Sequence, residues 1–60
     1  MNEKEWFDKG LALGNLGKWE EALKAYEKAI EINPLHVDAW YNKGVALANL
    51  GKREEALKAY

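Results

Sequence analysis

The sequence predicts an all-α protein made of antiparallel helix–turn–helix repeats stacked side by side, and two observations carry this prediction. The chain repeats itself, because residues 6–26 and 40–60 lie 34 positions apart and agree at 16 of 21 positions. A period of this length is typical of arrays of helical hairpins. Apolar residues within each copy also recur at intervals of three and four, as on one face of an α-helix. We therefore expect a single domain, residues 1–60, with one repeat over about residues 3–36 and a shortened one over about residues 37–60.

The first helix is expected over about residues 3–15. Asn2 precedes it as an N-cap, and Glu5 stands three positions later, where a carboxylate completes a capping box. Gly17 follows in the turn, because glycine takes the left-handed conformation that ends a helix without a Cβ penalty.

The second helix is expected over about residues 19–32 and ends before Pro34, because proline disfavours the helical conformation at the residue before it. The third helix restates the first over about residues 37–49. Residues 50–52 repeat the first turn, and a fourth helix is expected to start at about Arg53. The chain holds roughly two turns of that helix, fewer than the 12–15 residues at which an isolated helix becomes marginal.

Two glycines are expected in the middle of helices, where glycine costs about 0.5–1 kcal/mol relative to alanine. We interpret Gly10 and Gly44 as points of close approach between paired helices, at which a Cβ would not fit. The small residues expected opposite them are Ala22 and Ala56.

The three tryptophans are interpreted mainly as packing residues. Trp6 and Trp40 are expected to fill the core between paired helices, and Trp19, whose counterpart is Arg53, to lie at the edge of its pair. A stacking platform for bases or sugars is the alternative. His36, in the turn between the repeats, is expected to be exposed and structural, without a role in proton transfer.

Composition and charge exclude several classes of function. The formal net charge is −1 and charges of both signs alternate, which argues against nucleic acid as the main partner. Cysteine is absent and histidine occurs once, so neither a disulfide, a metal site nor a cofactor is expected. No apolar run suits a signal peptide or a membrane span, so the sequence predicts a cytoplasmic protein without a membrane partner.

These residues resemble the tetratricopeptide repeat family, whose signature is W-x₂-L-G-x₂-Y, then A-x₃-F, then A and P. The matching residues are Trp6, Gly10, Leu13, Ala22, Tyr26, Ala29 and Pro34, and in the second repeat Trp40, Gly44, Leu47, Ala56 and Tyr60. The chain departs from the signature at Lys9 and Lys43, which replace the leucine before the glycine. The resemblance implies a short right-handed superhelical solenoid that binds proteins and has no catalytic step.

In the resembling family, one face of the stacked helices lines a concave groove that holds a peptide or a partner helix. The groove candidates that the resemblance implies are Phe7, Leu11, Asn15, Tyr41, Asn42, Val45 and Asn49. The alternatives are core positions for the two aromatic residues and capping or solvated positions for the asparagines. Capture of a peptide's terminal carboxylate is not expected, because Phe7 and Leu11 stand where relatives carry Lys and Asn.

Peptide binding has two alternatives, catalysis and a structural role. Acid–base catalysis by carboxylates such as Asp8 or Glu20 is not expected, because they lie on solvated helix faces without a pocket. The structural alternative is a minimal or engineered repeat fragment whose main property is folding and self-assembly, with no natural ligand.

A homo-oligomer is expected in either case, most simply a dimer with the third helix at the interface, because such arrays need about three repeats and a cap. One chain's end could dock on another chain. Alternatively, two chains could exchange their final helices through residues 50–52, so that the third and fourth helices join into one long helix.

Overall fold

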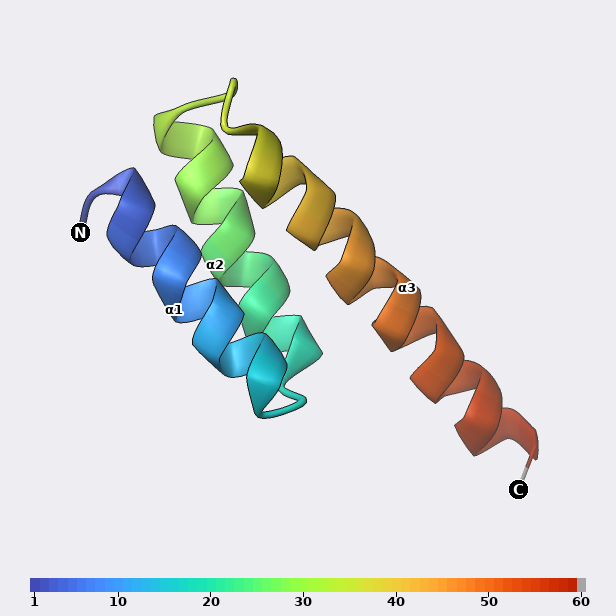
Figure 1. Cartoon of the computed structure of the whole chain (residues 1–60). Coiled ribbons are helices and arrows are strands. Elements are labelled where there is room, and N and C mark those ends of the chain that lie inside the picture. Colours follow the sequence, from blue (N-terminus) through green and yellow to red (C-terminus); the bar gives the residue numbers. More distant parts are fainter. Residues whose placement is uncertain (60) are drawn as a thin grey trace.

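The computed structural model describes residues 1–59 as three α-helices joined by short turns, with no strand in that range. Helix α1 spans Glu3–Asn15, α2 spans Trp19–Ile32 and α3 spans Val37–Ala59. α1 and α2 lie side by side and antiparallel, and α3 packs on α2 before it continues beyond the end of the pair (Figure 1). The predicted all-α helical-repeat fold is confirmed, but its division into four helices is not.

The predicted signals around α1 are all present. The Asn2 side chain accepts a hydrogen bond from the Glu5 N–H at 2.8 Å, and the Glu5 carboxylate accepts one from the Asn2 N–H at 3.1 Å. Gly17 has a φ of +75°, and the next residue, Lys18, donates its N–H to the Leu13 carbonyl at 2.9 Å. The turn between α1 and α2 therefore depends on glycine in the left-handed conformation.

The turn between the repeats contains a cap that sequence reasoning missed. α2 ends as predicted, with the Asn33 N–H bonded to the Ala29 carbonyl at 2.9 Å. His36 Nδ1 then accepts a hydrogen bond from the Ala39 N–H at 3.1 Å, near the start of α3. Its ring centroid lies 4.9 Å from that of Phe7. His36 is therefore half-buried and structural, and the expectation that it is exposed is wrong.

Small residues packed around one tyrosine form the core. Tyr26 is almost fully buried, together with Ala22 from α2 and Ala46 from α3. A Cβ on Gly10 would lie no more than 3.0 Å from three atoms of the Tyr26 ring. The absence of a side chain at Gly10 thus lets α1 approach α2 closely, as predicted, but the nearest side chain is that of Tyr26 and not the expected Ala22.

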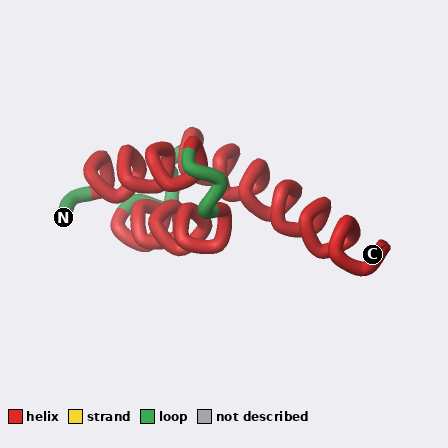
Figure 2. The backbone as a smooth tube through the Cα atoms, turned by 90° about the horizontal axis from the view of Figure 1, so that it is seen from below, coloured by secondary structure: helices red, strands yellow, loops and turns green. Residues whose placement is uncertain are grey.

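α3 runs without a break through residues 50–52, so the predicted second turn and the separate helix from Arg53 are wrong (Figure 2). The first repeat shows why. There, the Trp19 ring would lie 3.1 Å from a Cβ on Gly14, so the indole covers this glycine and helps to hold α2 against α1. The second repeat has Ala48 and Arg53 at these two positions. Alanine favours a continuous helix over glycine by about 0.5–1 kcal/mol, and the indole contact is lost.

The uninterrupted α3 leaves one face of its first half open. A Cβ on Gly44 would meet no other described residue within 4 Å, and Trp40 and Leu47 are each 49% exposed. Ala56 is exposed instead of lying opposite Gly44. The expectations of a close contact at Gly44 and of a buried Trp40 are therefore wrong, because the helix that would cover them does not fold back.

Candidate protein-binding surfaces

The predicted groove residues on α1 lie at four-residue intervals but differ in exposure. Phe7 is half-buried, with its ring centroid 5.8 Å from that of Tyr26 and 4.9 Å from that of His36. Leu11 is 36% exposed, and Asn15 is exposed. Phe7 thus contributes to the core, whereas the later part of this face is open to a ligand.

The predicted groove residues on α3 lie mostly one helical turn apart. Tyr41 is 72% exposed, and Val45 and Asn49 are half-buried. The Asn42 amide donates to the Asp38 carbonyl at 2.8 Å, and the Asn49 amide donates to the Val45 carbonyl at 2.9 Å. One N–H of each amide is bonded to its own helix, so the amide oxygen and the second N–H are the groups left for a ligand.

These residues are divided between two helices that pack on α2 (Figure 1). Phe7 joins the two parts, because it contacts His36 immediately before α3. We use the name groove face for the set Phe7, Leu11, Asn15, Tyr41, Asn42, Val45 and Asn49.

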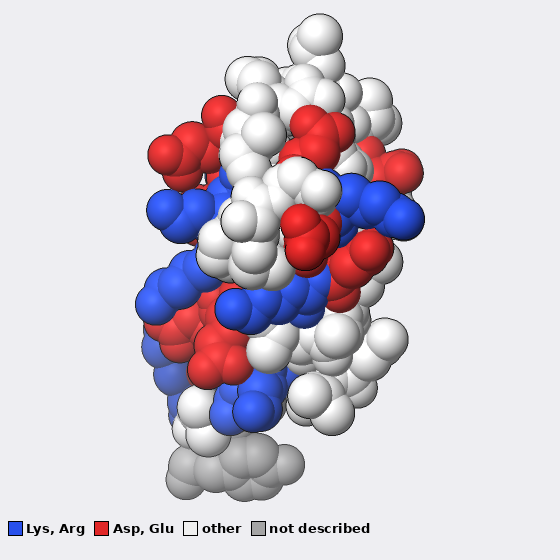
Figure 3. All heavy atoms as spheres, turned by 90° about the vertical axis from the view of Figure 1, so that its left-hand side faces the viewer, with Lys and Arg blue, Asp and Glu red and all other residues white. Residues whose placement is uncertain are grey.

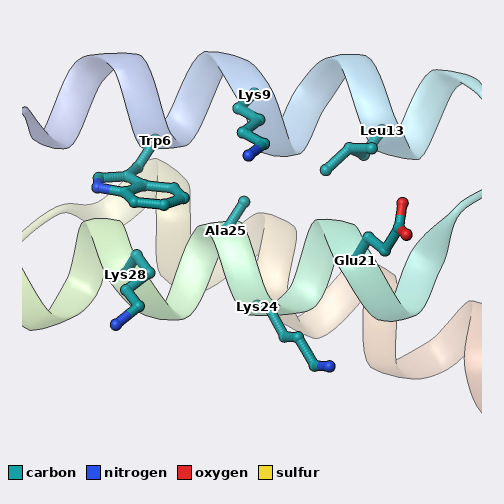
Figure 4. Close-up of a pocket in the computed structure, with 7 residues that line it drawn as sticks. All are labelled: Trp6, Lys9, Leu13, Glu21, Lys24, Ala25 and Lys28. Carbon is teal, nitrogen blue, oxygen red and sulfur yellow. The ribbon is translucent and has the colours of Figure 1, made fainter. Parts of the chain in front are cut away.

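A hollow between α1 and α2, which sequence reasoning missed, has a volume of about 390 Å³ (Figure 4). Trp6 and Leu13 from α1 and Ala25 from α2 are its apolar members. The Lys9 ammonium lies 5.2 Å from the centroid of the Trp6 ring, a cation–π distance. The complete lining is Trp6, Lys9, Leu13, Glu21, Lys24, Ala25 and Lys28.

The hollow and the groove face lie on different sides of α1. Leu11 and Leu13 are two residues apart, which is about 200° around a helix. Trp6, Lys9 and Leu13 are spaced by three and four residues in the sequence, which places them on one face of the helix and could have indicated that they line a common surface. The sequence predicts Trp6 to be core, but Trp6 and Leu13 are half-buried.

Charges of both signs surround these surfaces. Lys43 pairs with Glu27 at 3.6 Å between α3 and α2, and Lys28 pairs with Glu31 at 3.8 Å within α2. Lysine and acidic side chains are intermixed on the face drawn in Figure 3. That face has no continuous basic stripe of the kind typical of nucleic-acid-binding domains. Burial raises the pKa of the Tyr26 hydroxyl above its ordinary value.

Within residues 1–59, no group of three or more metal-binding side chains is placed to hold a metal ion. No helix in this part of the chain is both long enough and apolar enough to cross a membrane.

Comparison with known proteins agrees with the repeat architecture. Residues 7–60 match the family described as Tetratricopeptide repeat. The chain belongs to the tetratricopeptide repeat family. TPR repeat-containing protein MJ0941 of Methanocaldococcus jannaschii is 50% identical over 34 residues, which are 57% of this chain and 10% of that protein. Uncharacterized protein MJ0572 of the same organism is 47% identical over 34 residues, 57% of this chain and 40% of that protein. The chain thus spans less than half the length of either curated relative, and no solved structure matches it significantly.

Tetratricopeptide repeats generally mediate protein–protein interaction and are typically non-catalytic. In this member, the first repeat packs as a closed helical pair, with Gly10 and Tyr26 in contact. The second repeat leaves Trp40 and Gly44 exposed, and Tyr60, the last expected signature residue, lies outside the described residues.

Proposed function

We propose that this tetratricopeptide repeat chain binds an extended or helical segment of another protein along the groove face, without a catalytic step. The exposure of Tyr41 carries the proposal: the ring is 72% exposed on a regular helix, one turn before the half-buried Val45. Aromatic side chains are enriched among the residues that dominate protein–protein binding. Leu11, exposed on α1, extends the apolar surface.

The groove face suggests how a peptide is recognised. Apolar side chains of the ligand pack on Leu11, Tyr41 and Val45, which removes apolar surface from water. The amide oxygens of Asn42 and Asn49 accept hydrogen bonds from ligand N–H groups, and the second N–H of each amide donates to a ligand carbonyl, since the first is already bonded to the helix. The face therefore selects a segment by its shape and its apolar residues.

Panning a random linear peptide library displayed on phage against the chain tests this proposal. We expect selected peptides to lose at least tenfold in affinity, about 1.4 kcal/mol, when Leu11→Ala and Tyr41→Ala are combined. Lys28→Ala, in the hollow, is the matched control and should leave binding unchanged. Peptides that ignore the double substitution but depend on Lys28 would move the binding surface to the hollow.

Self-association is a second candidate function, and the open face of α3 favours it. Trp40, Gly44 and Leu47 are copies of Trp6, Gly10 and Leu13, which belong to the closed pair of the first repeat. A homo-oligomer would cover this face, and its stability would rise with protein concentration by mass action. Sedimentation equilibrium from micromolar to millimolar concentration checks this, because the mass should rise above the 6.8 kDa of one chain.

A further inference from the structure

We infer that copies of this chain associate head to tail, with the end of one α3 packed on the beginning of the α3 of the next copy. This inference rests on the self-association proposed above and adds its geometry. The acceptor face consists of Trp40, Gly44 and Leu47. The donor face consists of Arg53, Ala56 and Leu57. Both faces are exposed, since Leu57 is 69% exposed and Arg53 and Ala56 are open as well.

The chain already contains a template for this contact in the packing of α2 against α1. Residues 50–58 repeat residues 16–24 at every position except 53. In α2, the alanine of this segment, Ala22, is fully buried, whereas its copy Ala56 is exposed. Surfaces that pack together in the first repeat are thus both present, and both uncovered, in the second.

Charge supports the same pairing. Lys9 from α1 and Glu21 from α2 line one hollow in the first repeat. Their copies are Lys43, beside the acceptor face, and Glu55, beside the donor face. A second chain placed as in the template would bring Glu55 toward Lys43, which pairs with Glu27 of its own chain, and an acidic side chain near this lysine is more favourable than a basic one.

The straightness of α3 decides how the copies are arranged. Helical residues advance by about 100°, so the twelve residues from Gly44 to Ala56 place the donor face about 120° away from the acceptor face. One neighbouring α3 cannot lie on both sides of a straight helix at once. In a two-fold exchange of final helices, the donor face and the acceptor face of one α3 must both contact the same neighbouring α3. In a head-to-tail arrangement, each neighbour contacts only one of the two faces, so the other face is free to bind a further copy.

Two blocking substitutions test the arrangement. Gly44→Lys fills the acceptor face and Ala56→Arg fills the donor face, and both positions are exposed, so the single chain should still fold. By light scattering, the unmodified chain should exceed the mass of two chains as concentration rises. Each variant alone should associate at least tenfold more weakly. The mass of their equimolar mixture should rise to that of two chains and no further. The Gly44→Lys chain keeps its donor face and the Ala56→Arg chain keeps its acceptor face, so only one contact can form.

The alternatives give different masses. A plateau of the unmodified chain at the mass of two chains would show a closed dimer and overturn the head-to-tail arrangement. Variants that associate as strongly as the unmodified chain would place the interface elsewhere and overturn the inference alone. A single-chain mass at every concentration would remove the proposed self-association as well. Leu11→Ala, on the groove face of α1, is the control and should assemble normally.

Discussion

Gly10 and Gly44 hold the same place in their repeats but have opposite surroundings. A Cβ on Gly10 would collide with the Tyr26 ring, whereas a Cβ on Gly44 would meet no described residue within 4 Å. We expect Gly10→Ala to lower the free energy of unfolding by about 1–3 kcal/mol through overpacking. Gly44→Ala should raise it by about 0.5–1 kcal/mol, because alanine favours the helix. Urea unfolding at low micromolar concentration checks both, and similar losses at the two sites would show that Gly44 is covered in solution.

The buried Tyr26 hydroxyl should make the stability of the folded chain depend on pH in the alkaline range. Burial raises the pKa of its hydroxyl above the ordinary value of about 10. As the pH rises past about 10, the unfolded chain loses this proton before the folded chain does, so stability falls until the folded pKa is passed. Tyr26→Phe should remove this contribution while it keeps the ring. Urea unfolding at about pH 8 and pH 10.5 should show a smaller loss for Tyr26→Phe than for the unmodified chain. Tyr41→Phe, at an exposed position, is the control.

At the scale of the elements, residues 50–52 decide between one long helix and a hairpin. Gly51→Ala should strengthen α3, because alanine favours a helix and would be strained at the positive φ seen at Gly17. Arg53→Pro should break α3 locally, since proline lacks an N–H and clashes with the preceding turn. In a hairpin, that proline would stand at the first helical position, as Trp19 does, where proline is tolerated.

Circular dichroism of the two variants measures the outcome. Helicity should rise slightly for Gly51→Ala and fall for Arg53→Pro. If Arg53→Pro kept full helicity, the chain would already bend at this point in solution.

Local signals made the first repeat predictable from the sequence, and a tertiary contact made the second one different. The cap at Asn2 and the turn at Gly17 depend on interactions with residues no more than a few positions away. Residues 50–52 repeat the letters of the first turn but continue as a helix. What differs is the pair Gly14 and Trp19, which Ala48 and Arg53 replace; the sequence shows this exchange, but only the structure shows that the first pair is in contact and joins two helices.

The candidate surfaces divide in the same way. The family resemblance implied that Leu11 and Tyr41 are groove residues, and both side chains are exposed. The depth of the hollow beside Trp6 depends instead on how closely α1 and α2 approach, which the contact of Gly10 with Tyr26 helps to set. A sequence pattern can name the residues of such a hollow, but not whether space remains between them.

For the whole molecule, the end of α3 should add little to the stability of a dilute chain. Residues 51–58 are exposed throughout. A chain shortened to residues 1–50 should therefore unfold within about 1 kcal/mol of the full chain at low micromolar concentration, since surface changes have small effects. It should also lose self-association, because it lacks the donor face. A large loss of stability in the dilute monomer would show that this segment packs within its own chain.

The projecting end of α3 also governs how one molecule moves through water. The chain extends over 40 × 19 × 13 Å, and its radius of gyration is 11.9 Å. A compact domain of this length would have a radius of gyration of about 10.4 Å. An elongated particle meets more friction than a sphere of equal mass, so a size-exclusion column calibrated with globular standards should overestimate the mass of a lone chain. A bend in α3 would make the chain more compact and lower its apparent mass on the column, although the number of chains would stay the same. A diffusion measurement alone would therefore not distinguish a change in shape from a change in the number of associated chains.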